Sequence, residues 1–161
     1  MASPGLDVSQ FRTLVVRPTL KQIGLYSKAA EELLIGTGLQ ESRLKYIKQL
    51  GRGPALGVFQ MEPATYRDIW KNWLRYQPVL MNDLVNMVKS DDQPLKDRPK
   101  EMISNLAFAA AMCRIHYRRV RAPLPKAGDL LGQARYWKKY YNTHLGAGKV
   151  SEYTRAYRRW G

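Results

Sequence analysis

The chain is poor in residues that fix a fold covalently or bind metals. Its one cysteine, Cys113, cannot form an internal disulfide. The two histidines, His116 and His144, lie far apart and have no cysteine or acidic cluster beside them, so neither a metal site nor a cofactor is expected. Long apolar runs are also missing, and no segment is expected to span a bilayer. The first seven residues have no basic segment and no apolar core, so they do not read as a secretory signal.

Acidic residues are scarce as well. The 161 residues include 13 Asp or Glu and 27 Lys or Arg, which gives a net charge of +14. Most of the imbalance lies in residues 114–161, where twelve basic residues face only Asp129 and Glu152. This basic C-terminal third attracts polyanions such as cell-wall polymers, lipopolysaccharide or nucleic acid. Aromatic residues between the charges can stack on sugars or on bases, and the sequence does not choose between them.

Apolar spacing predicts a mostly α fold in one domain, residues 1–161, which is an ordinary size for a single hydrophobic core. Helices are expected over residues 8–24, 27–42, 64–74, 78–89 and 149–160. A long central buried helix is expected to begin at residue 99 and to continue through residue 117. Glycine and proline mark residues 49–55 as a loop or, at most, a short β-hairpin, and residues 90–99 as a surface connection.

One carboxylate stands out because of its position in the pattern. Leu34, Thr37, Gly38 and Glu41 fall at i, i+3, i+4 and i+7, so Glu41 shares a helix face with apolar and small residues. A poorly solvated carboxyl group has a raised pKa, which is what a general acid working near neutrality requires. A solvated glutamate near a helix end is the simpler alternative. Gly36 and Gly38 in the same helix predict the close packing of another backbone.

Two short motifs follow each other at this place. Glu41-Ser42 and then Gly57-Val58-Phe59-Gln60 resemble the Glu-Ser and Gly-Leu-Met-Gln pair of lytic transglycosylases and goose-type lysozymes, enzymes that cut peptidoglycan. The resemblance covers residues 33–65. It implies a lysozyme-like fold in which Glu41 protonates the glycosidic oxygen between N-acetylmuramic acid and N-acetylglucosamine. It also implies that Ser42, Phe59 and Gln60 line the substrate cleft.

The mechanism depends on a second carboxylate. No Asp or Glu lies between Ser42 and Met61, so a retaining pair with carboxylates about 5 to 5.5 Å apart is not expected. Lytic transglycosylases use one glutamate and the C6 hydroxyl of the substrate, whereas an inverting lysozyme needs a base, for which Glu62 is the candidate. Glu62 before Pro63 is also typical of the start of a helix. The sequence leaves both outcomes open.

The second half of the chain departs from the family pattern. Related enzymes often carry Ala-Ala-Tyr-Asn-Ala-Gly where this chain has Ala110-Ala111-Met112-Cys113-Arg114-Ile115, so their tyrosine is missing. Tyr117 is the candidate to replace it near the acid. Trp137, Tyr140 and Tyr141, at i, i+3 and i+4, are expected to pack on the core.

The resemblance therefore implies a monomeric phage lysis or entry enzyme that acts on glycan strands and meets an anionic cell envelope. Such an enzyme would be made in the cytoplasm and would reach the wall after holin-type release or in a virion. The alternative is a basic nucleic-acid-binding or virion structural protein without catalysis, which predicts salt-sensitive DNA binding and no role for Glu41. The catalytic interpretation needs no nucleic acid. Membrane disruption by residues 149–160 would be a secondary property.

Overall fold

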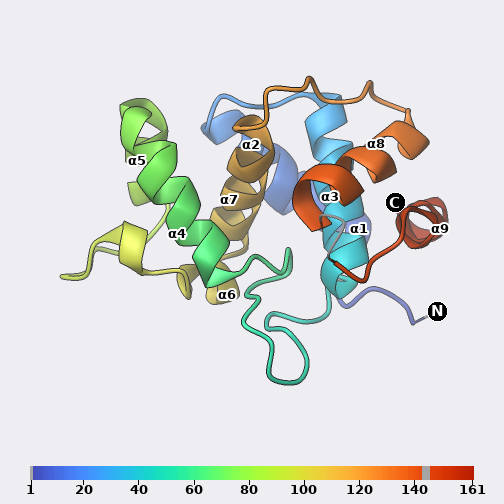
Figure 1. The fold of residues 1–161 in the computed structure, drawn as a ribbon, viewed down its shortest axis with the longest axis horizontal. Coiled ribbons are helices and arrows are strands. Elements are labelled where there is room, and N and C mark those ends of the chain that lie inside the picture. The colour runs from blue at the N-terminus through green and yellow to red at the C-terminus, as the bar shows by residue number, and fades with distance from the viewer. Residues whose placement is uncertain (1, 143–145) are drawn as a thin grey trace.

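The computed structural model describes residues 2–142 and 146–161, and its regular secondary structure is almost entirely helical (Figure 1). In chain order these are α1 (Val8–Gln10), a π-helical segment (Phe11–Val16), α2 (Arg17–Gln22), α3 (Lys28–Ser42), α4 (Pro63–Asn72), α5 (Pro78–Val85), α6 (Glu101–Ser104), α7 (Leu106–Arg118), α8 (Leu130–Trp137), a second π-helical segment (Lys138–Asn142) and α9 (Val150–Trp160). Two short 3₁₀ helices cover Leu74–Tyr76 and Leu95–Asp97. The predicted mostly α fold class is confirmed.

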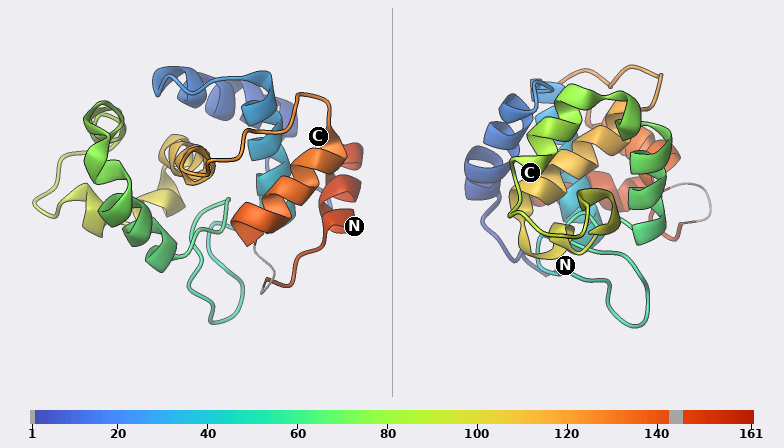
Figure 2. Two further views of the ribbon diagram at one scale, coloured as in Figure 1. Left: turned by 45° about the horizontal axis from the view of Figure 1, so that its top comes forward. Right: turned by 90° about the vertical axis from the view of Figure 1, so that its left-hand side faces the viewer.

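In the described residues, β structure is limited to two isolated bridges, Lys48 with Leu56 and Leu56 with Met61. They hold the loop between α3 and α4 that projects from the body in every view (Figures 1 and 2). The expectation of at most a short hairpin agrees with this, although no strand forms in the part of the chain that the structure describes.

The N-terminal helix is not uniform. The chain is helical from Val8 to Gln22, but its middle widens into a π-helical segment instead of the single α-helix expected over residues 8–24. Pro18, in the first turn of α2, has no N–H to donate to the preceding turn, and a π-helical segment is one way in which a helix accommodates such a missing bond. The helix ends before Gly24, whose positive φ of 68° the α-helix does not allow.

Helix α3 matches its prediction and lies at the centre of the packing. The Ser27 hydroxyl caps its start by accepting from the N–H of Ala30 at 3.0 Å, and α7, α8 and α9 pack around it. Gly36 faces Tyr153 of α9: a Cβ at Gly36 would lie 2.0 Å from the Tyr153 hydroxyl oxygen. The expected close packing of a backbone is therefore wrong: side chains approach Gly36 and Gly38 instead, because the Tyr153 and Leu44 side chains fill the space beside the helix.

The long central helix expected from residue 99 is in fact two helices. Asn105 is extended, with φ −114° and ψ 99°, and its side chain accepts from the N–H of Phe108 at 2.9 Å. Asn105 thus ends α6 and caps α7. Every residue from Phe108 to Tyr117 is buried, so α7 is the predicted central buried helix. It separates α4 and α5 from α3, α8 and α9 (Figure 1).

Two further helices end earlier than predicted. α4 stops at Asn72 and α5 at Val85, each followed by irregular structure where the apolar spacing had continued. α9 matches the expected helix over residues 149–160 to within one residue. Within residues 2–142 and 146–161, no helix combines the length and apolar character that crossing a bilayer requires.

Candidate active site

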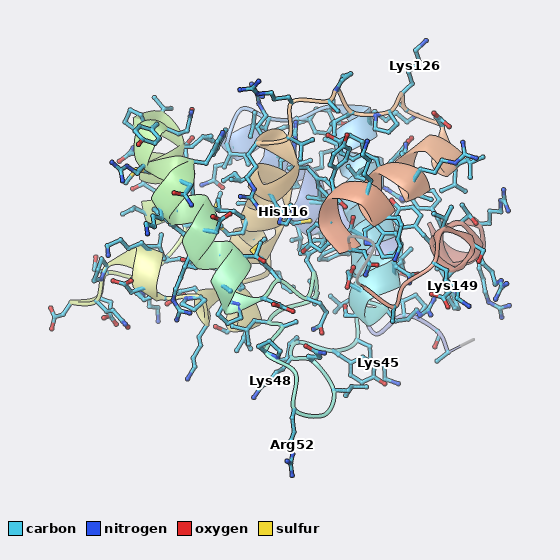
Figure 3. The ribbon with its side chains drawn as sticks, viewed as in Figure 1. Lys45, Lys48, Arg52, His116, Lys126 and Lys149 are labelled. Carbon is cyan, nitrogen blue, oxygen red and sulfur yellow. The ribbon has the colours of Figure 1, made fainter. Side chains whose placement is uncertain are left out.

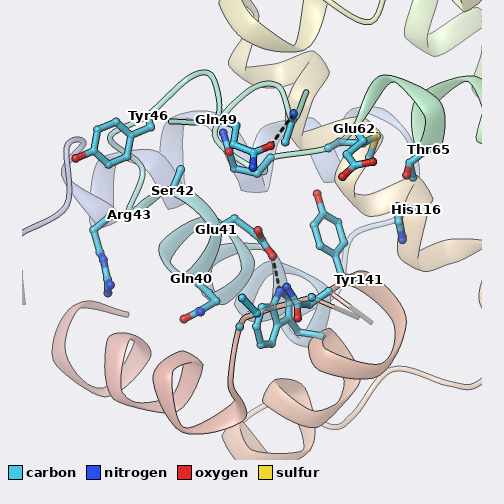
Figure 4. Close-up of a pocket in the computed structure, with 18 of the residues that line it drawn as sticks. Gln40, Glu41, Ser42, Arg43, Tyr46, Gln49, Glu62, Thr65, His116 and Tyr141 are labelled. Atoms are coloured by element: carbon cyan, nitrogen blue, oxygen red, sulfur yellow. Dashed lines mark hydrogen bonds between the residues drawn. The ribbon is translucent and has the colours of Figure 1, made fainter. Parts of the chain in front are cut away.

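A cleft of about 710 Å³ opens at the C-terminal end of α3. One wall comes from the loop after α3 and the start of α4, and the other from the end of α8, the π-helical segment that follows it and residues 146–148. The side chain of His116 on α7 also borders it. The cleft thus brings together segments that are up to about a hundred residues apart in the chain (Figure 4).

Glu41 lies in this cleft, in the last turn of α3, where the helix packs against other elements on most sides. Its carboxyl group is half-buried, and burial raises its pKa from an ordinary 4.5 to about 7. A hydrogen bond from Trp137 and the positive charge of Lys138 oppose this increase without cancelling it. The carboxyl group therefore keeps a large protonated fraction near neutrality, as the sequence pattern predicted.

Trp137 is the partner of that carboxyl group. Its Nε1–H donates to Glu41 Oε1 at 2.9 Å, across 96 positions of sequence. The indole is fully buried and packs on the Tyr153 ring, with 5.5 Å between ring centroids. On another side Gly148 approaches it so closely that a Cβ there would lie 2.6 Å from Trp137 Cη2. The position of the donor, and through it the carboxyl group, is fixed by packing.

Lys138, the next residue, is the basic group whose positive charge acts on Glu41. Its ammonium donates to Asn142 Oδ1 at 2.8 Å and to the Gly146 carbonyl at 2.9 Å. The charge is thus held by the far wall of the cleft rather than in an ion pair with the carboxylate. Within the described residues, Glu41 therefore has one side-chain hydrogen bond, from Trp137, and an open side toward the cleft (Figure 4).

The residues 57–60 form a tight turn that faces the end of α3. Gly57 has φ 74°, and a Cβ there would lie 2.4 Å from the Met102 carbonyl oxygen on α6, so glycine is required. Gln60 also has a positive φ, of 50°, and its side-chain amide donates to the Gly57 carbonyl at 2.9 Å. Gln60 lines the cleft, as the resemblance implied for its position.

Ser42 borders the cleft, but its hydroxyl mainly connects two segments by hydrogen bonds. Its hydroxyl donates to the Val58 carbonyl at 2.5 Å and accepts from the N–H of Leu44 at 3.1 Å. These bonds connect the end of α3, where Arg43 turns into the left-handed region with φ 58°, to the Gly57–Gln60 turn. Ser42 therefore positions Glu41 relative to Gln60, and its hydroxyl is not free for a ligand.

Two residues expected in the cleft are not there. The Phe59 side chain is 2% exposed and packs on the Phe11 ring in the core, and only its carbonyl reaches the cleft region. Tyr117 is 1% exposed, and its hydroxyl pairs with Thr37 Oγ1 at 2.8 Å inside the core. Burial is the physical reason in both cases: each ring lies on the inner face of its element.

Tyr141 occupies the place expected for Tyr117. It lies in the π-helical segment after α8, lines the cleft beside Glu41, and donates to the Phe59 carbonyl at 2.6 Å (Figure 4). Burial and the nearby Glu41 and Cys113 hold the pKa of its hydroxyl well above the ordinary value, so the hydroxyl stays protonated. The predicted packing of Trp137 and Tyr141 on the core is confirmed, and nothing in their local sequence shows that they also line the cleft.

Glu62 is the other acidic side chain among the described residues that line the cleft. It is exposed and directly precedes α4, with Pro63 in the first turn, and its side chain makes no capping hydrogen bond. The helix-start interpretation is thus correct for its backbone. Its carboxylate nevertheless points into the same space as Glu41 and Tyr141 (Figure 4).

His116 closes the inner end of the cleft. Its Nε2 pairs with the Tyr140 carbonyl at 3.0 Å, and its ring lies 4.7 Å from the Tyr141 ring. Burial lowers the pKa of the imidazole from 6.5 to about 4, so His116 is neutral at physiological pH. Because a carbonyl only accepts, Nε2 carries the proton. His144, the other histidine, lies outside the described residues.

The described part of the chain holds no group of three or more His, Cys, Asp or Glu side chains that could bind a metal ion. The cleft combines one half-buried acid, Glu41, with a tyrosine, a glutamine and one exposed carboxylate. Comparisons with protein-family models, curated proteins and solved structures found no match to this chain.

Proposed function

We propose that the protein cleaves the β-1,4 bond between N-acetylmuramic acid and N-acetylglucosamine in peptidoglycan, with Glu41 as the general acid. The observation that carries the proposal is the half-buried Glu41 carboxyl group in a 710 Å³ cleft, with a pKa raised by burial to about 7. A neutral carboxylic acid in a cleft is suited to protonating a poor leaving group. The substrate class rests on the Glu41-Ser42 and Gly57–Gln60 motifs.

The hydrogen bond from Trp137 favours one oxygen of Glu41 as the proton carrier. The indole N–H is a donor only and Oε1 accepts from it, and because the carbonyl oxygen of a neutral carboxyl group is the better acceptor, we place the acid proton on Oε2. In the proposed reaction, Oε2 gives this proton to the glycosidic oxygen as the bond to the anomeric carbon breaks. The resulting carboxylate is then stabilised by the same Trp137 N–H and by the positive charge of Lys138.

The second half of the reaction has two forms. In transglycosylation, the C6 hydroxyl of the muramic residue attacks the anomeric carbon, and the Glu41 carboxylate takes its proton, which restores the acid. In hydrolysis with inversion, a water attacks instead and a second carboxylate takes its proton. Glu62 is the acidic side chain available for that role among the described cleft residues.

Product analysis tests the proposal. Purified peptidoglycan is incubated with wild type and with Glu62→Gln, and the soluble products are analysed by mass spectrometry with and without borohydride reduction. Non-reducible 1,6-anhydro products, formed equally by both proteins, would identify a lytic transglycosylase. Reducible products that Glu62→Gln fails to form would identify an inverting lysozyme with Glu62 as base.

The absence of any soluble product would refute the glycosidase proposal. In that case, DNA binding that weakens steeply with salt would favour the nucleic-acid-binding alternative, which depends on the +14 charge and not on Glu41.

The biological setting that we propose for the glycosidase is a phage lysis or entry protein, released by a holin or delivered in a virion.

A further inference from the structure

We propose that the loop of residues 45–52, here called the basic loop, binds the surface of an anionic lipid bilayer. It projects from the body of the protein in every view, and Lys45, Lys48 and Arg52 extend from it at one end of the molecule (Figures 2 and 3). This proposal goes beyond the glycosidase activity and does not depend on it.

The basic loop exposes apolar side chains between its charges. Ile47 is 51% exposed and Leu50 is 66% exposed. Single exposed apolar side chains are common, but apolar side chains grouped in one projecting segment and flanked by basic residues are typical of an interaction site. Leu50 lies at the edge of the cleft and could contact a bound glycan, but Ile47 does not line the cleft, so a glycan would not account for its exposure.

The charge of the loop indicates what that partner is. Lys45, Lys48 and Arg52 are all exposed, and no acidic residue occurs between Ser42 and Met61 to neutralise them. A soluble polyanion would attract the three charges but would leave Ile47 and Leu50 in water. The interface of an anionic bilayer accommodates both, because basic groups meet the headgroups while apolar side chains enter the acyl boundary.

The basic loop is also held in shape before it binds. The Gln49 N–H donates to the Ala55 carbonyl at 2.9 Å, and the Gln49 side-chain oxygen accepts from the N–H of Ala55 at 3.1 Å. At the base of the loop, the Gly57 N–H donates to the Ile47 carbonyl at 2.8 Å. Little ordering is therefore required when the side chains enter an interface.

The exposed face of α9 provides a matched contrast. Arg155, Arg158 and Arg159 form another basic surface there, but no large apolar side chain of α9 is exposed beside them. If charge alone brought the protein to membranes, this face would serve as well as the basic loop. The apolar residues are what distinguish the two.

Vesicle co-sedimentation tests the proposal. The probes are vesicles of phosphatidylglycerol with phosphatidylcholine, vesicles of phosphatidylcholine alone, and soluble polyphosphate as a competitor. We expect wild type to bind the anionic vesicles, and Ile47→Ser/Leu50→Ser to bind them at least about tenfold more weakly because two apolar side chains no longer enter the interface. Lys48→Gln/Arg52→Gln should bind about 25-fold more weakly, about fivefold for each charge.

Two control variants make the result specific. Val79→Ser removes a side chain that is 75% exposed on α5, and Arg158→Gln/Arg159→Gln removes two charges from α9; both should bind anionic vesicles nearly as wild type does. Equal unfolding midpoints would confirm that the variants are folded. Three results would overturn the proposal: Ile47→Ser/Leu50→Ser binds anionic vesicles as wild type does, the α9 variant alone loses binding, or wild type does not bind anionic vesicles. Glycan cleavage is not used as a readout in these measurements, because Leu50 also lines the cleft.

Discussion

Replacing the acid of the cleft should make the protein more stable above neutral pH. Glu41→Gln keeps the size of the side chain, and its amide oxygen can still accept from Trp137 Nε1. What the substitution removes is the ionisation of a half-buried group. At about pH 8 the wild-type carboxyl group must ionise where it is poorly solvated, while the glutamine stays neutral.

The magnitude follows from the pKa of Glu41, which burial raises from 4.5 to about 7. One pKa unit corresponds to about 1.4 kcal/mol, so ionisation in the folded state costs about 3 kcal/mol relative to the unfolded chain. Because the pKa of Glu41 is higher in the folded state than in the unfolded chain, its ionisation costs wild type no stability below about pH 4.5. Wild type loses stability as the pH rises toward 7, and the loss is constant above that.

Urea unfolding followed by circular dichroism measures the effect. We expect wild type and Glu41→Gln to be about equally stable near pH 4. At about pH 8 the variant should be up to about 3 kcal/mol more stable, or about 6 to 12 °C higher in thermal midpoint. Glu62→Gln, at an exposed carboxylate, is the matched control and should change neither value by more than about 0.5 kcal/mol. If Glu41→Gln gains no stability at the higher pH, Glu41 is not desolvated and the general-acid argument fails.

Three other substitutions test the surroundings of Glu41. The Trp137 N–H donates to the Glu41 carboxyl group and lowers its pKa, so Trp137→Phe should raise that pKa. The alkaline limb of the pH profile for glycan cleavage should then move up by about one pH unit. An unchanged limb would contradict the pairing. Gly57→Ala should cost more than about 2 kcal/mol in urea unfolding because its Cβ would meet a carbonyl oxygen of α6, whereas Gly51→Ala, with a similar φ and open space, should cost about 1 kcal/mol. Equal losses would show that the contact is unimportant. His116→Gln should resist acid better than wild type, since burial lowers the imidazole pKa from 6.5 to about 4 and wild-type stability is lost as the pH falls through that range. An unchanged acid-unfolding midpoint would be inconsistent with a buried neutral imidazole.

The features that local sequence determines were predicted well. The start of α3 follows from Ser27 as a cap, and the burial of one face follows from the spacing that leads to Glu41. The loop after α3 follows from its glycines and Pro54. The raised pKa of Glu41 could be predicted for the same reason, because helical spacing alone puts its carboxyl group on a face with apolar residues.

The break in the central helix could not be predicted from apolar spacing. The pattern continues through Asn105 without a gap, since α6 and α7 both turn apolar residues inward on either side of it. Only the capping preference of asparagine was available as a signal. The same applies to the ends of α4 and α5, where apolar residues continue into irregular structure and still pack on the core.

The partners of Glu41 depend on tertiary structure. Trp137 is 96 positions away, and at i and i+4 Trp137 and Tyr141 have the spacing of a face that packs on the core. Both do pack, but at the edge of the core where it borders the cleft. The misplacement of Tyr117 has the same origin: helical period shows that α7 is buried and does not show which side chains reach its end at the cleft.

The central claim is that Glu41 is the acid of a peptidoglycan glycosidase, and the most direct test is the rate at which soluble muropeptides leave purified peptidoglycan. Wild type and Glu41→Gln are compared after urea unfolding has shown that both are folded. The account predicts release by wild type and a rate at least about a hundredfold lower for the variant. Equal rates for the two proteins, or no release by wild type, would contradict it.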